Sequence, residues 1–310
     1  MQTLASFFLP RNIALPPAEE RRVEVAPGVE LLCMCHWQTE RRGPMTVIVV
    51  HGLEGSSDSQ YMRGIAAKAL AAGMNVVRVN QRNCGNTDRF SPTLYNSGLS
   101  GDIRAVAEHF LERDGISQFV LAGFSMGGNL VLKLAGEWGS AAPAEFRGVV
   151  GVCPAMDLAV GADALHEPAN RIYEYYFLVN LTRRFRRKVR LFPQTFDPER
   201  LRGVRTLRQF DDRVTAFYCG YTGADDYYAR AAASNVVDRI AVPARILHAA
   251  SDPFVRFRTE TLAKTLGNPN IEFVESEDGG HCAFIGVSDA GYDGRWAERE
   301  VVEFARERAK

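Results

Sequence analysis

LAGFSMGGNL, residues 121–130, places the motif Gly123-Phe124-Ser125-Met126-Gly127 between an apolar run and a helical pattern. The run FVLAGF (119–124) is typical of a buried strand, and MGGNLVLKLAGEW (126–138) is typical of a helix. A G-x-S-x-G motif at a strand-to-helix turn presents its serine at the edge of a parallel sheet. Because a serine hydroxyl alone is a poor nucleophile, the chain must also supply a base, an acid that orients the base, and oxyanion donors.

Apolar runs and helical patterns alternate on both sides of this motif, which predicts an α/β fold with a mainly parallel central sheet and helices on both faces. An additional hairpin over 21–37, with Pro27-Gly28 as its turn, would add an antiparallel edge. The other expected strands are 45–52, 75–80, 147–154, 243–251 and 271–276, and the other expected helices are 60–72, 98–113, 256–266 and 296–309.

Residues 157–235 interrupt this alternation, because no strand pattern is evident there. We interpret the segment as a mostly helical cap inserted after the sixth core strand, with residues 1–156 and 236–310 forming the core. Helices that simply extend the core are the alternative. The segment contains the aromatic residues Tyr173, Tyr176, Phe177 and Phe185, which suggest an apolar acyl or aryl substrate group, although they could equally pack within the cap. The basic run TRRFRRKVR (182–190) is interpreted as a solvated helix face rather than an anion site.

The expected base is His281, because in this chain order the histidine follows the last strand, and EDGGHCAFIG (277–286) comes directly after 271–276. His248 lies inside the expected strand 243–251, where a hydrogen-bonded core histidine is the simpler interpretation. His109 forms an H-x-x-x-x-D pattern with Asp114, which is sometimes an acyltransferase signature, but it precedes the strand that leads to Ser125.

The expected orienting acid is Asp252, which directly follows the penultimate strand and precedes a proline. A carboxylate there would accept a hydrogen bond from the His281 ring and fix its tautomer. Glu277 and Asp278 are alternatives, but their short spacing from the histidine would strain a contact within one loop. Asp157, which follows the sixth strand, is the reserve candidate.

Two backbone amides are expected to bind the oxyanion. The Met126 amide begins the helix after Ser125, where the helix dipole adds to its effect. The second donor should come from HGLEGSS (51–57), which follows the strand 45–52, and the Leu53 amide is the candidate. His51 is interpreted as an organiser of this loop rather than as a catalytic group.

Composition excludes several classes of protein. Lys+Arg and Asp+Glu both number 37 in 310 residues, which gives no electrostatic basis for binding nucleic acid. No run is long and apolar enough to span a membrane, and MQTLASFFLPRN (1–12) lacks the features of a secretory signal, so we expect a cytoplasmic protein. FFLP (7–10) and the basic run leave peripheral membrane contact open. Six cysteines without a C-x-x-C pair are interpreted as buried small residues, and neither a metal nor an organic cofactor is expected.

With these residues in place, the chain resembles the α/β-hydrolase superfamily, and within it the YheT-like branch (AB hydrolase 4), which includes animal ABHD lipid hydrolases. The resemblance covers most of residues 45–285 and includes cap segments. The matching stretches are HGLEGSSDSQY (51–61), NQRNCGNTDRFSPTLYNSGLSGDIRAV (80–106), GFSMGGNLVLKLAGE (123–137), RTLRQFDDRVTA (205–216), YYARAAASN (227–235), ASDPF (250–254) and GGHCAFIG (279–286).

The resemblance implies a triad on Ser125, Asp252 and His281 and an oxyanion loop over 51–55. One departure is Asn83, where the family usually has glycine between an arginine and a cysteine, but asparagine tolerates positive φ better than most residues. The family acts on carboxylic esters, including acylglycerol-type lipids. The sequence therefore predicts a serine esterase that acts through an acyl-enzyme. An acyltransferase, thioesterase or amidase with the same triad, or a non-catalytic binding protein of the same fold, are the alternatives.

Overall fold

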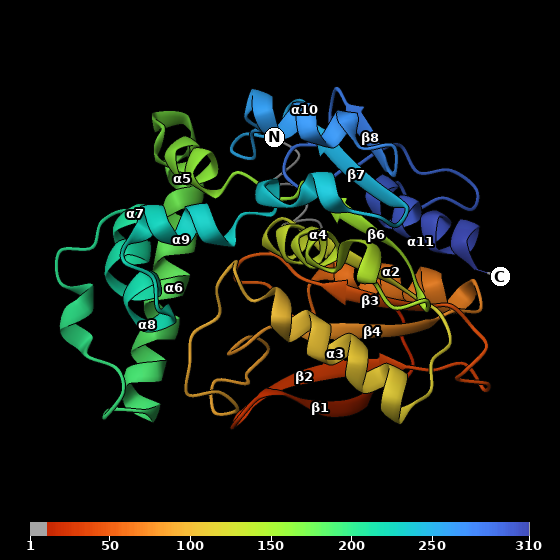
Figure 1. Cartoon of the computed structure of the whole chain (residues 1–310), viewed down its shortest axis with the longest axis horizontal. Helices are drawn as coiled ribbons and strands as arrows, with labels where there is room; N and C mark the ends of the chain where they lie inside the picture. The colour runs from red at the N-terminus through yellow and green to blue at the C-terminus, as the bar shows by residue number, and fades with distance from the viewer. Residues whose placement is uncertain (1–10, 310) are drawn as a thin grey trace.

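The computed structural model describes residues 11–309, and its centre is an eight-stranded sheet with the order β1-β2-β4-β3-β5-β6-β7-β8 (Figure 1). Strands β3 to β8 run parallel to one another, whereas β2 pairs antiparallel with both β1 and β4 and so forms an antiparallel edge. This confirms the predicted mainly parallel sheet and the additional hairpin. The strands are β1 (Glu19–Ala26), β2 (Val29–His36), β3 (Thr46–Val50), β4 (Asn75–Asn80), β5 (Phe119–Phe124), β6 (Phe146–Val152), β7 (Ala244–Ala249) and β8 (Ile271–Ser276).

Helices cover both faces of the sheet because its central strands carry apolar side chains on both sides. On β3, Ile48 and Val50 pack into one buried cluster with residues of α3 and α4, while Val47 and Val49 pack into a second cluster with residues of α2 and α11. This two-sided burial is typical of parallel strands. The helices are α2 (Gln60–Ala71), α3 (Ser100–Arg113), α4 (Met126–Trp138), α10 (Thr259–Gly267) and α11 (Trp296–Arg308).

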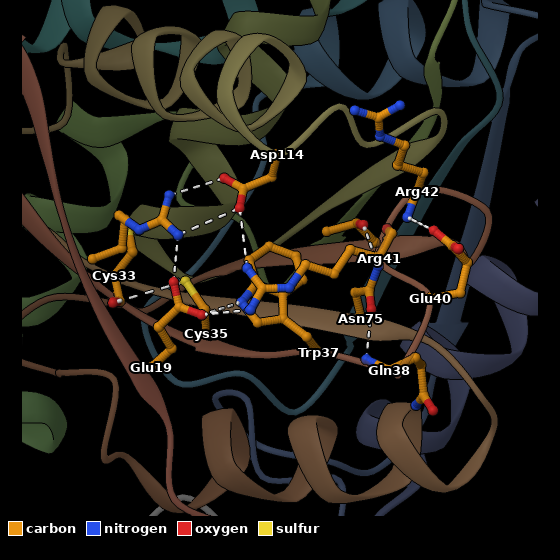
Figure 2. A network of polar contacts seen from close by, with 12 residues as sticks. Glu19, Cys33, Cys35, Trp37, Gln38, Glu40, Arg41, Arg42, Asn75 and Asp114 are labelled. Carbon is orange, nitrogen blue, oxygen red and sulfur yellow. Dashed lines mark hydrogen bonds and ion pairs between the residues drawn. The ribbon is translucent and has the colours of Figure 1, made fainter.

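The antiparallel edge is fastened to the core by a network of charges (Figure 2). Asp114, directly after α3, accepts hydrogen bonds from Arg21 on β1 at 3.0 Å and from Arg41 at 3.4 Å. Glu19 accepts from Arg41 at 2.9 Å and from the indole of Trp37 at 3.1 Å. The aspartate of the H-x-x-x-x-D pattern therefore anchors the hairpin, which gives this pattern a structural explanation.

Within residues 157–235 the structure contains helices and turns but no strand, and these helices lie to one side of the sheet (Figure 1). They are α5 (Leu158–His166), α6 (Arg171–Leu191), α7 (Leu207–Phe210), α8 (Phe217–Cys219) and α9 (Ala224–Ala231). A π-helical turn, Asp211–Ala216, joins α7 to α8, and short 3-10 turns occur at Gly139–Ala141, Pro168–Asn170, Pro198–Leu201, Ala233–Asn235 and Val237–Arg239. The division into core and cap stays a prediction.

The basic run on α6 is not simply a solvated face, and that interpretation is wrong for two of its members. Lys188 is fully buried and donates to the carbonyl oxygen of Asp88 at 2.8 Å. Arg184 is also buried and pairs with Glu54. Within the run, Arg183, Arg186 and Arg190 are exposed. The buried cations fasten α6 onto loops of the sheet.

No helix within residues 11–309 combines the length and the apolar character needed to cross a bilayer. The FFLP stretch (7–10), which motivated the idea of peripheral membrane contact, lies outside the described residues.

Candidate active site

Ser125 occupies a sharp turn between β5 and α4. Its φ of 53° and ψ of −116° are unusual for a residue that has a side chain. Its amide donates to Val152 at 2.9 Å, and its carbonyl oxygen accepts from Asn129 at 3.0 Å and Ala155 at 3.2 Å. Three hydrogen bonds thus hold a conformation that would otherwise relax, as is common at functional sites.

The glycines of the motif are required because the backbone approaches closely on both sides of this turn. A Cβ at Gly123 would lie 2.2 Å from the carbonyl oxygen of Gly127. A Cβ at Gly127 would lie 2.4 Å from the carbonyl oxygen of Val50, at the end of β3. Gly52 lies against the serine itself, since a Cβ there would be 3.1 Å from the Cβ of Ser125.

The loops after β7 and β8 bring Asp252 and His281 together. The Nδ1 atom of His281 is 2.8 Å from Oδ2 of Asp252, whose Oδ1 accepts from the amides of Phe254 at 3.1 Å and Val255 at 2.9 Å. Burial opposes the charge of Asp252, but the His281 ring and these amides outweigh it and lower the pKa of the carboxyl. Burial also opposes a charged imidazole, but the Cys282 sulfur and Asp252 together raise the pKa of His281.

The other acids have different surroundings. Asp157 accepts from the amide of Arg258 at 2.8 Å and from the hydroxyl of Thr261 at 2.9 Å, so it joins the start of α5 to α10. Glu277 and Asp278 are exposed. Among the four carboxylates considered from the sequence, Asp252 is hydrogen-bonded to the His281 ring.

His248 is buried on β7, as expected, and its ring lies 4.7 Å from that of Phe257. Burial lowers the pKa of His248, which favours the neutral ring. Its Nδ1 has no hydrogen-bond partner among the described residues, so the expectation of a hydrogen-bonded core histidine is wrong in that respect.

His51 organises the loop after β3. It is fully buried, its Nδ1 lies 2.7 Å from the carbonyl oxygen of Gly52, and its Nε2 accepts from the amide of Gln81 at 3.1 Å. Burial lowers the pKa of His51 to about 4, so the ring is neutral near pH 7. Both ring nitrogens are used by the backbone, which agrees with the organiser interpretation.

The backbone amides on either side of Leu53 both donate hydrogen bonds to tyrosine hydroxyls. Gly52 donates to the hydroxyl of Tyr61 at 3.0 Å, and Glu54 donates to the hydroxyl of Tyr95 at 3.3 Å. Between them, the Leu53 amide has no acceptor among residues 11–309. Hydrogen bonds therefore hold this loop on both sides of Leu53, whose amide N–H could donate to a bound molecule.

The Met126 amide, at the start of α4, likewise has no acceptor within the described part of the chain. Leu53, Met126 and Ser125 line the same pocket. Backbone amides are seldom left without a partner in folded proteins, so these two donors in the pocket of Ser125 are the candidates for binding an oxyanion.

Two pockets meet at Ser125. The inner pocket lies beneath α5–α9, encloses about 1030 Å³ including its open mouth, and is lined by apolar side chains that include Leu165, Leu181, Phe185 and Phe210. The outer pocket includes Gly52, Tyr61, Tyr176, His281 and Cys282. Ser125, Leu53 and Phe177 line both pockets. Of the four aromatic residues singled out from the sequence, Phe177 and Phe185 thus reach the inner pocket, whereas Tyr173 packs against Phe254.

The loop over residues 51–55 is tied to α6 by a buried ion pair. Arg184 Nε lies 2.9 Å from Glu54 Oε1, and the two side chains are only 10% and 6% exposed. Arg184→Met would leave the Glu54 carboxylate buried without its counter-charge. We expect the free energy of unfolding to fall by about 3–5 kcal/mol, as measured by urea denaturation.

The matched control for this prediction is Arg187→Met. Arg187 lies on the same helix and pairs with Asp88 at 3.3 Å, but its side chain is 42% exposed. Loss of an exposed pair should cost less than about 1 kcal/mol. If the free energy of unfolding fell equally in the two variants, the buried Arg184–Glu54 pair would have no special role in stability.

Asp211 is a buried acid in the inner pocket, where Tyr228 and Thr215 each donate to it at 2.7 Å. Burial raises the pKa of Asp211 to about 6, although both hydrogen bonds oppose the shift. The folded state therefore holds this proton more tightly than the unfolded chain. The resulting stabilisation is complete below about pH 4 and is lost as the pH rises through about 6.

Asp211→Asn removes this titration. Relative to the wild type, the free energy of unfolding of Asp211→Asn should increase by about 2–3 kcal/mol between about pH 4 and pH 7, as measured by urea denaturation at each pH. Asp212→Asn, at the exposed neighbouring position, controls for the loss of a charge. The raised pKa would be contradicted if the free energies of unfolding of Asp211→Asn and the wild type differed by the same amount at every pH.

Comparison with known proteins shows the family of the chain. The sequence model of the alpha/beta hydrolase fold family matches residues 46–286, which is most of the chain. The chain belongs to the α/β-hydrolase family. Its relatives include YheT of Escherichia coli (strain K12), which is 32% identical over 242 residues that cover 77% of this chain and 70% of that protein. The mouse phospholipase ABHD3 is 27% identical over 77% of this chain, but the chain spans only 58% of its length.

Solved α/β-hydrolase structures share the fold at low sequence identity. An esterase of Pyrococcus furiosus is 16% identical, with a TM-score of 0.62 over 97% of each chain. Est1E of Butyrivibrio proteoclasticus is 17% identical, with a TM-score of 0.59 over 93% of this chain and 98% of that chain. These likenesses show that the chain shares its fold with solved structures.

Proposed function

We propose that this chain is a serine hydrolase that cleaves carboxylic esters with an apolar acyl group through an acyl-enzyme. The observation that carries the proposal is the junction of the two pockets. There, a strained serine lies beside two uncommitted amides, and a histidine aligned by a buried carboxylate lines the same outer pocket. Relatives named as phospholipase ABHD3 and monoacylglycerol lipase ABHD2 support an ester substrate of lipid type.

In the proposed mechanism, His281 takes the proton of Ser125 as the hydroxyl attacks the ester carbonyl. The Leu53 and Met126 amides hold the oxyanion of the tetrahedral intermediate. His281 then protonates the leaving alcohol, and an acyl group remains on the serine. A water molecule, deprotonated by the same imidazole, releases the acid, while Asp252 orients the ring and stabilises its charged form.

The acyl group is assigned to the inner pocket because its lining is mostly apolar, and the alcohol portion is assigned to the outer pocket. In this assignment α5–α9 act as the cap that encloses the acyl chain. Transfer to an alcohol or hydrolysis of a thioester would use the same acyl-enzyme. The identity of the acceptor is tested by product analysis in water with and without added alcohol.

The assignment of the acyl group is tested with p-nitrophenyl esters from acetate to long chains. Gly161 on α5 lines the inner pocket, and a Cβ there would meet only one atom, the carbonyl oxygen of Phe254 at 3.6 Å. The Cβ of Gly161→Leu therefore fits, and its isobutyl group should occupy part of the inner pocket. We expect kcat/KM for long chains to fall by about 10- to 100-fold while acetate hydrolysis is largely retained, because each buried methylene contributes about 0.8 kcal/mol.

The control is Gly101→Leu. Gly101 is also a helical glycine with open space at its Cβ, but it lines neither pocket. Its chain-length profile should match that of the wild type. If Gly161→Leu left the profile unchanged, the acyl group would not occupy the inner pocket.

A further inference from the structure

Two cysteines from distant parts of the chain lie beside His281. Cys282 Sγ is 3.8 Å from His281 Nε2, and the Cys282 amide donates to Cys153 Sγ at 3.4 Å. The two sulfur atoms and a ring nitrogen of His281 all lie within 4.8 Å of one another. Cys153 follows β6 and Cys282 follows β8, so the fold rather than the sequence brings them together.

The spacing of these donors suits a tetrahedral metal ion. Zinc lies about 2.3 Å from thiolate sulfur and about 2.0–2.1 Å from imidazole nitrogen, so neighbouring sulfur and nitrogen ligands are about 3.6 Å apart. The 3.8 Å between Cys282 Sγ and His281 Nε2 is close to this value. Thiolate and imidazole donors together favour Zn²⁺ over the hard cations Mg²⁺ and Ca²⁺.

The surroundings of the donors are also those of a metal site. Asp252 holds Nδ1 of His281, which directs Nε2 toward the sulfur atoms, and a carboxylate behind a ligating imidazole is the usual second layer of zinc sites. Cys153 and Cys282 have φ values of 41° and 61°, a region that non-glycine residues seldom occupy. Both cysteines therefore have a backbone conformation that the surrounding fold must hold in place.

An ion can reach these donors from the outer pocket. His281 and Cys282 line that pocket with Ser125, while Cys153 is fully buried behind them. A fourth coordination position would face the pocket and take a water molecule. A second group of donors, Cys153, His248 and Asp252, is buried throughout and lines neither pocket, so it lacks such a route.

We propose that Cys153, His281 and Cys282 bind one Zn²⁺ ion and that the bound ion inhibits the hydrolase. On binding, the two thiols release their protons to solvent and the His281 Nε2 lone pair is donated to zinc. The imidazole then cannot accept the Ser125 proton. The inhibitory part of this inference rests on the proposed function, whereas the binding part does not.

Binding is tested without reference to activity. Co²⁺ and then Zn²⁺ are titrated into the full chain in the presence of a phosphine reductant, which prevents a disulfide between the cysteines. The wild type should bind one equivalent of Co²⁺ with thiolate-to-metal charge-transfer absorption, and Zn²⁺ should displace the Co²⁺. Cys282→Ser and Cys153→Ser should each lower the affinity for Zn²⁺ by at least about tenfold, because even second-layer changes cost that much.

Cys219→Ser is the matched control, since Cys219 is also partly exposed but lies outside the donor group. It should bind Zn²⁺ as the wild type does. Thermal unfolding of each variant shows whether it is folded, and if Cys153→Ser is not, the partly exposed Cys282 position decides the result. No binding by the wild type, or unchanged binding in folded Cys282→Ser, would overturn the proposed site.

Inhibition is tested separately on any ester that the wild type hydrolyses. Zn²⁺ should reduce turnover in proportion to the occupancy found in the binding titration, and a chelator should restore it. Cys282→Ser should require at least about tenfold more Zn²⁺ for the same inhibition. Stoichiometric binding with unchanged turnover would overturn the inhibitory role. A wild type that hydrolyses no ester would count against the proposed function, and the binding titration would still decide the metal site.

Discussion

Ser125→Ala is expected to lower kcat for ester hydrolysis by about 10⁴- to 10⁶-fold, with little change in stability. The methyl group of alanine occupies the same space but supplies no oxygen to attack the carbonyl. Alanine also has the same Cβ as serine at the strained φ of 53°, so the turn should be retained. The measurement is steady-state turnover of p-nitrophenyl esters, combined with a urea denaturation curve.

The control for this prediction is Ser100→Ala. Ser100 is buried at the start of α3, where its hydroxyl donates to Glu137 at 2.7 Å, and it lines neither pocket. Turnover of this variant should remain within about threefold of the wild type. If Ser125→Ala kept more than about a tenth of the wild-type kcat, another group would be the nucleophile.

Asp252→Asn is expected to lower kcat by about 10⁴-fold, which is the typical cost of losing the orienting carboxylate of such a triad. The Asn side chain can present an N–H to Nδ1 of His281, which would select the wrong tautomer of the ring. Its amide oxygen can still accept from the amides of Phe254 and Val255, so the loop should stay folded. The measurement is the kcat of the purified variant across pH.

Asp157→Asn and Asp278→Asn test the alternative acids. The Asp157 carboxylate binds the amide of Arg258 and the hydroxyl of Thr261, and Asp278 is exposed. Each of these variants should lower kcat by less than about tenfold. A large loss in Asp157→Asn together with near-normal turnover in Asp252→Asn would transfer the orienting role to Asp157.

The strands and the strand-to-helix turn at Ser125 could be predicted because their sequence patterns are local. The apolar run 119–124 coincides with β5, because a strand that is buried on both faces is mostly apolar. The stretch 75–80 coincides with β4, although Asn75, Arg78 and Asn80 are polar residues buried on it. The strand-to-helix context of Ser125 could be recognised for the same reason. At Asn83 the expected tolerance of positive φ agrees with the observed value of 65°.

Features that depend on distant contacts could not be predicted in this way. The run 182–190 resembles a solvated helix face because sequence gives no sign that Arg184 will reach Glu54, 130 positions away. In the same way, Cys153 and Cys282 carry no spacing signature, and only the parallel order of β6, β7 and β8 brings them to one edge of the sheet. The expectation that the cysteines are buried is confirmed for Cys33, Cys35, Cys84 and Cys153, whereas it is wrong for Cys219 and Cys282, which are partly exposed.

The most direct test of the central claim, that Ser125 is an activated nucleophile, is labelling of the folded protein with a fluorophosphonate probe followed by peptide mass spectrometry. We predict one phosphonyl group per chain, located on Ser125, and loss of labelling in His281→Ala although the serine is still present. No labelling of the folded wild type, or labelling of a different serine, would contradict the claim.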